Sequence, residues 1–307
     1  MIELIGYGFI FEDIIMTIVQ AIILGVIQGL TEFLPVSSSG HLAIMKNILR
    51  MDLETGALYD VLLHVATLVA ICIVMRKDIV KLILEFISIV RDVFTNFLIF
   101  IDRITHKDDQ YYIKIMSSAY RRFVVLIIVS SIPTAIIGFL LNDIIETVEN
   151  ELLVPGICLI ATAVIILISD FLADGTKKPK DATVYDAFAI GTAQGIATLP
   201  GLSRSGTTIT ACILCGFDRK FAVKYSFIMS MPAIFGALIL KLSKISSETV
   251  TGGDIAVYIV GMVIAAVVGY FALIFTTKLV QKKSFKYFAF YCFGIGVVSI
   301  IAYIISF

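Results

Sequence analysis

Charge is scarce in this sequence. Only 16% of the 307 residues are Asp, Glu, Lys or Arg, whereas 59% are hydrophobic and the mean hydropathy is +1.00. Soluble domains carry about 25% charged residues, so this scarcity excludes an ordinary cytosolic enzyme. The 24 Lys and Arg also balance the 24 Asp and Glu. Without net charge, the electrostatic argument for a nucleic-acid partner is absent.

Cysteine is too sparse to form a disulfide framework. The five cysteines are scattered, and most lie in apolar runs where cysteine behaves as a small hydrophobe. Cys212 and Cys215 have the spacing of a redox motif, but no second pair or nearby histidine accompanies them. We interpret the pair as structural.

Long apolar runs dominate the chain. Six are long enough to cross a bilayer as helices, which takes about 20 residues each: about 57–75, 123–141, 152–169, 225–240, 255–277 and 287–307. Two others, about 14–34 and 184–199, end in breaks rich in Pro, Gly and Ser, and a segment too short to cross follows each break. The sequence therefore predicts an all-α integral membrane protein with six transmembrane helices and two re-entrant helical hairpins.

The two hairpins are similar in sequence. Over positions 21–40, an offset of 166 residues aligns seven identities without a gap. They are Ala21, Gly25, Gln28, Gly29, Ser37, Ser39 and Gly40 with Ala187, Gly191, Gln194, Gly195, Ser203, Ser205 and Gly206. Because Gly, Gln and Ser dominate the matches, duplication explains them better than shared hydrophobicity. We predict one polytopic domain over 1–307, with repeats at about 14–142 and 152–307.

The distribution of basic residues predicts the orientation. With an outer amino terminus and hairpins that return to their side of entry, inner segments hold 19 of the 24 Lys and Arg. Outer segments hold four, and Arg204 lies in a hairpin. Because basic residues favour the inner side, the two hairpins enter from opposite faces and the repeat is inverted.

A polar insertion at about 78–118 interrupts the first repeat. Its apolar residues recur at helical spacing with charges between them. This pattern indicates either a helix on the inner membrane surface or a solvated connector.

The hairpin breaks carry polar residues that are expensive inside a bilayer. The first break offers Gln28, Glu32, Ser37, Ser38, Ser39 and His41, and the second offers Gln194, Thr198, Ser203, Arg204, Ser205, Thr207 and Thr208. Glu32 and Arg204 can neutralise each other in an empty pocket. Each break also begins a new helix, and helix amino termini bind anions. We therefore predict an anion site at membrane depth, for a phosphorylated lipid.

Hydrolysis at this site requires a nucleophile, a proton carrier and charge neutralisation. Ser38 is a candidate nucleophile, with His41 as its base, and a water nucleophile is the alternative. Arg204 suits bidentate phosphate binding. Glu32 is expected either to hold Mg²⁺ or Ca²⁺ or to transfer protons.

Structural explanations compete for several of these residues. Ser37 and Ser39 are also good helix caps. The Gly25-x-x-x-Gly29 spacing and its copy favour close helix packing. We interpret His64, in an apolar helix, as a packing residue, with lining of the site as the alternative.

Two motifs identify a resemblance. The run from Gln28 to His41 resembles the (Glu/Gln)-x-x-x-Glu signature of the undecaprenyl-diphosphate phosphatases, the bacitracin-resistance family. The run from Pro200 to Thr208 resembles their second signature, Pro-Gly-x-Ser-Arg-Ser-x-x-Thr. Together with the length and the hairpins, the resemblance covers essentially the whole chain. The first signature position is Gln28, whose amide cannot act as a base.

The resemblance implies a plasma-membrane enzyme that converts undecaprenyl diphosphate to undecaprenyl phosphate and inorganic phosphate, recycling the carrier lipid for cell-wall synthesis. It implies a site open to the outer face, a divalent cation and a possible homodimer. It assigns catalysis to Glu32, Ser38, His41 and Arg204, the metal to Glu32, and phosphate binding to Ser203, Arg204, Ser205 and Thr208. From their positions in the breaks, Gln28, Ser37 and Ser39 are further substrate-binding candidates. The rival interpretations are an inverted-repeat transporter or flippase for a lipid phosphate or other anion, and a non-catalytic scaffold.

Overall fold

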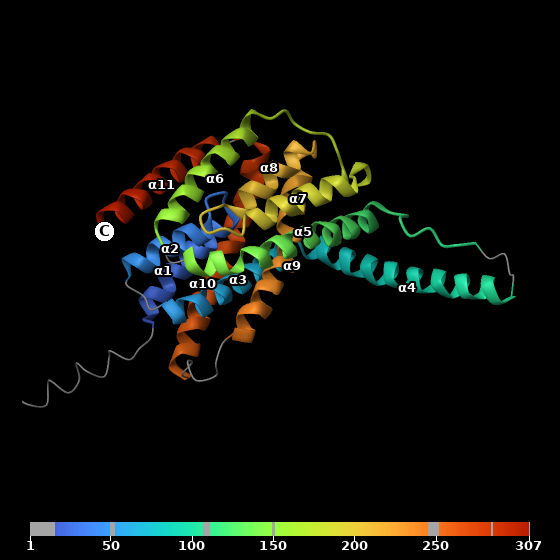
Figure 1. Cartoon of the computed structure of the whole chain (residues 1–307), viewed down its shortest axis with the longest axis horizontal. Helices are drawn as coiled ribbons and strands as arrows, with labels where there is room; N and C mark the ends of the chain where they lie inside the picture. The colour runs from blue at the N-terminus through green and yellow to red at the C-terminus, as the bar shows by residue number, and fades with distance from the viewer. Residues whose placement is uncertain are drawn as a thin grey trace, which may run out of the picture.

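A computed structural model describes residues 16–49, 53–106, 111–148, 151–244, 252–283 and 285–306. In these ranges the chain forms eleven α-helices and one short 3₁₀-helix (Figure 1). They are α1 (Ile18–Phe33), α2 (Ser38–Ile48), α3 (Leu53–Val74), α4 (Arg76–His106), α5 (Ala119–Val148), α6 (Leu153–Phe171), η1 (Pro179–Asp181), α7 (Val184–Ile196), α8 (Arg204–Leu214), α9 (Arg219–Lys244), α10 (Gly252–Gln281) and α11 (Lys286–Ser306). The all-α prediction is confirmed.

Long apolar helices make this a multi-pass membrane protein. By length and composition, α5, α6, α9, α10 and α11 can each cross a bilayer within the described residues. A sixth span is present if α3 and α4 are counted together, although the chain bends by 90° between them. All six predicted spans therefore lie on observed helices.

The two predicted breaks are present where the Pro-, Gly- and Ser-rich runs occur. Helix α1 ends at Phe33 and the short helix α2 starts at Ser38, while α7 ends at Ile196 and the short helix α8 starts at Arg204. The matching helices also begin alike, because Thr17 and Thr183, 166 positions apart, each form a capping box. The similarity between the two segments thus extends beyond the motif residues.

Small residues allow the broken helices to pack closely on long ones. Helix α1 packs along α10 and α7 packs along α5. A Cβ atom placed on Gly25 would lie 2.5 Å from the carbonyl oxygen of Gly261, and one on Gly191 would meet the backbone of Ser130. The interpretation of the glycine spacing as a packing feature is confirmed.

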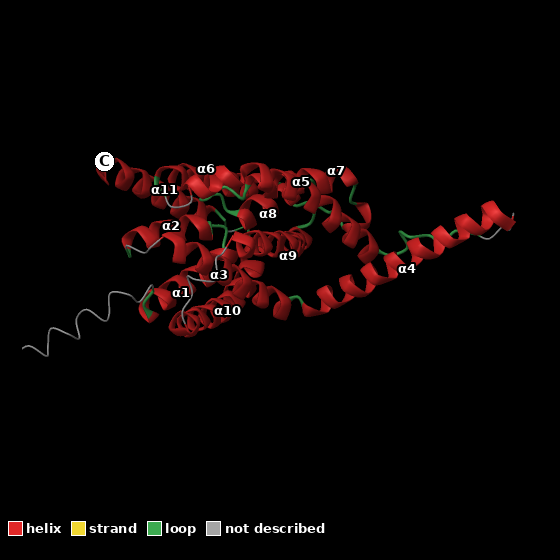
Figure 2. Ribbon diagram, turned by 60° about the horizontal axis from the view of Figure 1, so that its bottom comes forward, coloured by secondary structure: helices red, strands yellow, loops and turns green. Residues whose placement is uncertain are grey.

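Helix α4 projects away from the rest of the bundle (Figures 1 and 2). Most of its large apolar side chains are exposed, among them Val80, Ile83, Leu84, Phe86, Ile87, Val90, Phe94, Phe97, Phe100 and Ile104. Its inner part is fixed to α5 by Arg121, whose guanidinium contacts Glu85 at 3.0 Å and Asp92 at 2.7 Å. The helical part of the predicted insertion is therefore the long amphipathic helix α4, which ends at His106, whereas the described residues 111–118 are not helical.

Candidate active site

The two breaks lie against each other near the centre of the bundle (Figure 1). The backbone N–H of Gly201 donates a hydrogen bond to Ser39 Oγ at 3.2 Å. In the opposite direction, Ser205 Oγ donates to the carbonyl oxygen of Leu34 at 3.3 Å. Each break thus supplies a serine to the other, and the residues on both sides are placed in one site.

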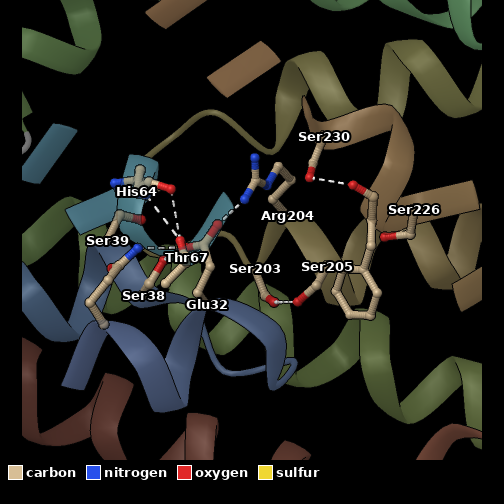
Figure 3. A network of polar contacts seen from close by, with 12 residues as sticks. Glu32, Ser38, Ser39, His64, Thr67, Ser203, Arg204, Ser205, Ser226 and Ser230 are labelled. Carbon is tan, nitrogen blue, oxygen red and sulfur yellow. Dashed lines mark hydrogen bonds and ion pairs between the residues drawn. The ribbon is translucent and has the colours of Figure 1, made fainter. Parts of the chain in front are cut away.

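Glu32 is the centre of the polar network in this site (Figure 3). Its side chain is only 2% exposed and forms an ion pair with Arg204 across the two breaks. Its other oxygen accepts hydrogen bonds from Ser38 Oγ at 2.6 Å and Gln28 Nε2 at 3.0 Å. The Nε2 atom of His64 lies 3.4 Å from the same oxygen. The predicted mutual neutralisation of Glu32 and Arg204 is confirmed in this structure.

The flanking serines form two matching pairs. Ser37 and Ser203 are the caps of α2 and α8, and each accepts a hydrogen bond from the backbone N–H three residues later, at 3.2 Å and 3.1 Å. The Oγ atoms of Ser37 and Ser39 are 3.3 Å apart, as are those of Ser203 and Ser205. Ser37 has a φ of 69°, which is unusual for a residue other than glycine. These contacts orient the first turns of both short helices toward the same space.

His41 is not brought to Ser38. Its Nδ1 lies 2.7 Å from the carbonyl oxygen of Ser37, and its Nε2 lies 2.8 Å from the hydroxyl of Tyr291. Its ring also stacks on that tyrosine, with the ring centroids 5.5 Å apart. Both ring nitrogens therefore already have partners, one in the backbone at the start of α2 and one on Tyr291 of α11. The expected base for Ser38 is not found in this position, whereas Glu32 contacts the Ser38 hydroxyl directly.

Thr208 and Gln28 support the site from behind. The hydroxyl of Thr208 lies 2.6 Å from Ser226 Oγ and donates to the carbonyl oxygen of Arg204 at 2.7 Å. Both Thr208 and Gln28 are fully buried. Neither lines the cavity described next, so in this structure they fix the neighbouring groups rather than face open space.

A cavity of about 610 Å³ opens over the network. Its polar lining includes Glu32, Ser37, Ser38, Ser39, Ser203, Arg204 and Ser205, and its walls include apolar residues of α5 and α9 such as Phe139, Ile145, Ile234 and Leu240. Ligand sites commonly combine a mostly apolar wall with a few polar groups. The shape and lining suit a lipid with an anionic head.

Lys46 and Asp60 are among the polar residues of this cavity that received no role from the sequence, and the interpretation of His64 as a packing residue is wrong, because it lines the cavity as the alternative held. Lys46 and Asp60 line it as an ion pair with a distance of 2.6 Å, and His64 lines it beside Glu32. Lys46 lies on α2, whereas Asp60 and His64 lie four residues apart on α3. That spacing puts two polar side chains on one face of an apolar helix, which was the available signal. The pairing with Lys46 depends on the tertiary structure.

A divalent cation such as Mg²⁺ or Ca²⁺ in this site would need oxygen donors. Within the described residues, no group of three or more His, Cys, Asp or Glu side chains is gathered as in a dedicated metal site. Glu32 nevertheless offers a carboxylate, and Gln28 Oε1 is buried and has no hydrogen-bond partner. Mg²⁺ is commonly held by one or two carboxylates and the substrate's phosphate oxygens. The Glu32 carboxylate, which lines the cavity, fits such a cation.

Comparisons with known proteins agree with the motifs. The chain matches the family described as "Bacitracin resistance protein BacA" over residues 21–298. It is 38% identical over 284 residues to an undecaprenyl-diphosphatase of Methanosphaera stadtmanae, covering 92% of this chain and 97% of that protein. It is 40% identical over 281 residues to an undecaprenyl-diphosphatase of Treponema denticola, covering 92% of this chain and 96% of that protein.

Proposed function

This chain belongs to the bacitracin resistance protein BacA family, and we propose that Glu32, Ser38 and Arg204 carry out its reaction. The family and its full-length relatives establish the activity: the chain is an integral membrane undecaprenyl-diphosphatase. The reaction releases inorganic phosphate from undecaprenyl diphosphate and leaves undecaprenyl phosphate. We further propose that this product is the carrier lipid for cell-wall synthesis.

Arg204 binds the terminal phosphate in this proposal. Its guanidinium faces the cavity. Among the described residues, the Glu32 carboxylate is its one hydrogen-bond and ion-pair partner. A phosphate with two oxygens toward this planar group would replace that carboxylate, because Arg and phosphate form paired charge-assisted hydrogen bonds. The first turns of α2 and α8 add backbone N–H groups and partial positive charge. Substrate binding thus separates Glu32 from Arg204.

Ser38 is the nucleophile in this proposal, and its 2.6 Å hydrogen bond to Glu32 is the observation that carries the assignment. Ser38 Oγ forms a bond to the terminal phosphorus while its proton passes to Glu32. The bond between that phosphorus and the bridging oxygen breaks, and undecaprenyl phosphate leaves with the electron pair. Water then attacks the phosphoserine, which releases inorganic phosphate, and Ser38 regains a proton.

The assignment gives His64 and the serine pairs supporting parts. His64 Nδ1 lies 2.8 Å from the carbonyl oxygen of Asp60, so this nitrogen carries a proton and donates. Its Nε2 lies 3.4 Å from Glu32, and in this assignment Nε2 also carries a proton, so that the imidazolium attracts the carboxylate. We assign His64 the positioning of the Glu32 carboxylate. Ser39 and Ser205, which both line the cavity, are assigned to hold the two breaks together.

A divalent cation, Mg²⁺ or Ca²⁺, is part of the proposal. Glu32, which lines the cavity, is the residue that would hold it, together with phosphate oxygens of the substrate. When bound, it would neutralise negative charge on the diphosphate and so favour attack at phosphorus. Loss of activity on addition of a chelator, and its recovery on addition of Mg²⁺ or Ca²⁺, tests this requirement.

The membrane arrangement is proposed as two re-entrant hairpins in an inverted repeat. Three features support it: the matched caps at Thr17 and Thr183, the reciprocal contacts between the breaks, and the corresponding packing of α1 on α10 and α7 on α5. The cavity is lined by Lys46, Asp60, Asn142 and Leu240, near the helix ends that the Lys and Arg count assigns to the outside. We therefore propose that the active site opens outward. Helix α4 is proposed to lie on the inner membrane surface.

Phosphate release by purified protein tests the assignment. The full chain in detergent, supplied with undecaprenyl diphosphate and Mg²⁺, should liberate one inorganic phosphate per undecaprenyl phosphate. Acid quenching during turnover of substrate labelled at the terminal phosphorus should trap label on Ser38. Turnover without protein-bound label would assign the attack to water, and folded protein without turnover would contradict the active-site assignment.

A further inference from the structure

A second cavity lies at the opposite end of the bundle from the active site's outer opening. It has a volume of about 730 Å³ and lies between the start of α5, the segment that leads into η1, and the start of α9. Its lining includes the charged residues Lys178, Asp218, Lys220 and Lys224 and the aromatic residues Phe123 and Phe221. The Lys and Arg count assigns these segments to the inner side. We call this cavity the inner pocket.

The inner pocket has an excess of positive charge. Three of its lining residues are lysines and one is an aspartate. The lysine of α9, Lys224, contacts Asp78 of α4 at 2.7 Å. Lys178 and Lys220 are exposed and have no ion-pair partner among the residues that the structure describes. The two lysines therefore give the pocket a positive excess over its one carboxylate, Asp218.

The negative groups at the inner pocket are already engaged. Asp218 accepts a hydrogen bond from the backbone N–H of Phe221 at 3.0 Å, as a cap of α9. Asp78 accepts hydrogen bonds from both Lys224 Nζ and Tyr120 Oη, each at 2.7 Å. Neither carboxylate is paired with Lys178 or Lys220. A ligand that carries its own negative charge would complete the site.

An aromatic wall stands behind the lysines. Phe123 and Phe221 are buried and pack edge to face, with ring centroids 5.0 Å apart. Ala119 and Pro179 extend this apolar lining. A charged rim with an apolar wall suits a phosphate group attached to a hydrophobic body, and basic pockets on the inner side of membrane helices bind anionic headgroups.

We propose that the inner pocket binds a phosphate group, carried by an anionic phospholipid headgroup or by free inorganic phosphate. Lys178 and Lys220 contact the phosphate, while Lys224 stays paired with Asp78. The aromatic wall favours the phospholipid, because free phosphate gains nothing from an apolar surface. This site is separate from the catalytic network, so its occupancy does not depend on the proposed nucleophile.

Native mass spectrometry of the delipidated full chain tests the proposal. The probes are dioleoyl-phosphatidylglycerol, dioleoyl-phosphatidylcholine and inorganic phosphate. The Lys178→Gln/Lys220→Gln variant should bind the first phosphatidylglycerol about tenfold more weakly than the unmodified chain, as expected for the loss of two cations beside one anion. The matched control Lys114→Gln/Lys278→Gln removes the same charge from exposed lysines outside the pocket and should bind as the unmodified chain does.

The outcomes separate the two phosphate sources. Weakening of phosphatidylglycerol in the pocket variant alone, with phosphatidylcholine unaffected, identifies a lipid headgroup. Weakening of inorganic phosphate in the pocket variant alone identifies free phosphate. Equal weakening in both double variants would indicate general surface electrostatics, and no weakening in either would leave the pocket without this ligand; both results overturn the proposal. Phosphate release by the pocket variant, measured in parallel, is expected to be unchanged.

Discussion

Replacement of Arg204 by lysine isolates the contribution of the guanidinium. The substitution keeps the positive charge beside Glu32 but removes the planar pair of donors that the proposed phosphate contact requires. One charge-assisted hydrogen bond contributes about 1.5–3 kcal/mol. At about 1.4 kcal/mol per factor of ten, Arg204→Lys should lower kcat/KM by about 10- to 150-fold.

The assay is phosphate release from undecaprenyl diphosphate by purified protein in detergent, over a range of substrate concentrations. Arg122→Lys is the matched control, because Arg122 is exposed and its guanidinium donates to the carbonyl oxygen of Lys180 near the inner pocket. The control should stay within about twofold of the unmodified enzyme, since a surface contact contributes little. Near-normal turnover by Arg204→Lys would refute the bidentate contact.

A stability measurement separates catalysis from folding in this experiment. Arg204→Ala leaves the Glu32 carboxylate, 2% exposed, without its ion-pair partner. Breaking a buried pair in this way costs about 3–5 kcal/mol, which should appear as a lower thermal midpoint. Glu32→Gln in the same chain removes the uncompensated charge and should restore most of that midpoint while activity remains absent. An unchanged midpoint in Arg204→Ala would show that the ion pair contributes little to the fold.

Three further predictions concern single residues. Ser38→Ala should lower turnover by more than about 10³-fold if its hydroxyl attacks phosphorus, and a loss below about tenfold would assign the attack to water. His64→Leu should lower kcat/KM by about tenfold through loss of its contact with Glu32, whereas His64→Gln, which retains a donor, should recover most of it; equal losses would contradict the positioning role. Gly25→Ala should destabilise the protein by about 1–3 kcal/mol because the added Cβ meets the backbone of α10. The control Gly294→Ala has open space around it in α11 and should not lower the thermal midpoint, because alanine favours a helix more than glycine does.

Hydrophobic patterning explains why most helices were predictable. A charge-free run long enough to cross a bilayer has few alternatives to a helix, because only internal hydrogen bonds satisfy its backbone there. Proline, glycine and serine then marked the two breaks within a few residues of their observed positions, Phe33 to Ser38 and Ile196 to Arg204. Glu32, Ser38 and Arg204 were recognisable for the same reason: each is costly in an apolar environment without a partner.

The direction of side chains was less predictable than their identity. His41 follows Ser38 by one helical turn, but its ring points back to its own helix and to Tyr291, which comes from the far end of the sequence. His64 has the opposite relation, since it lies on a different helix from Glu32 yet faces it. Rotamer choice depends on the neighbours that packing supplies.

Composition and local pattern alone determined that this protein is a membrane protein built from helices, with two similar broken segments and a set of polar residues at the breaks. These properties follow from the energy of placing each residue in lipid and from backbone preferences, which are local. Tertiary structure decided that Glu32 pairs with Arg204, that His64 rather than His41 faces the carboxylate, and that Lys46 meets Asp60 in the cavity. Those contacts join distant parts of the chain, and their geometry exists only after the helices have packed.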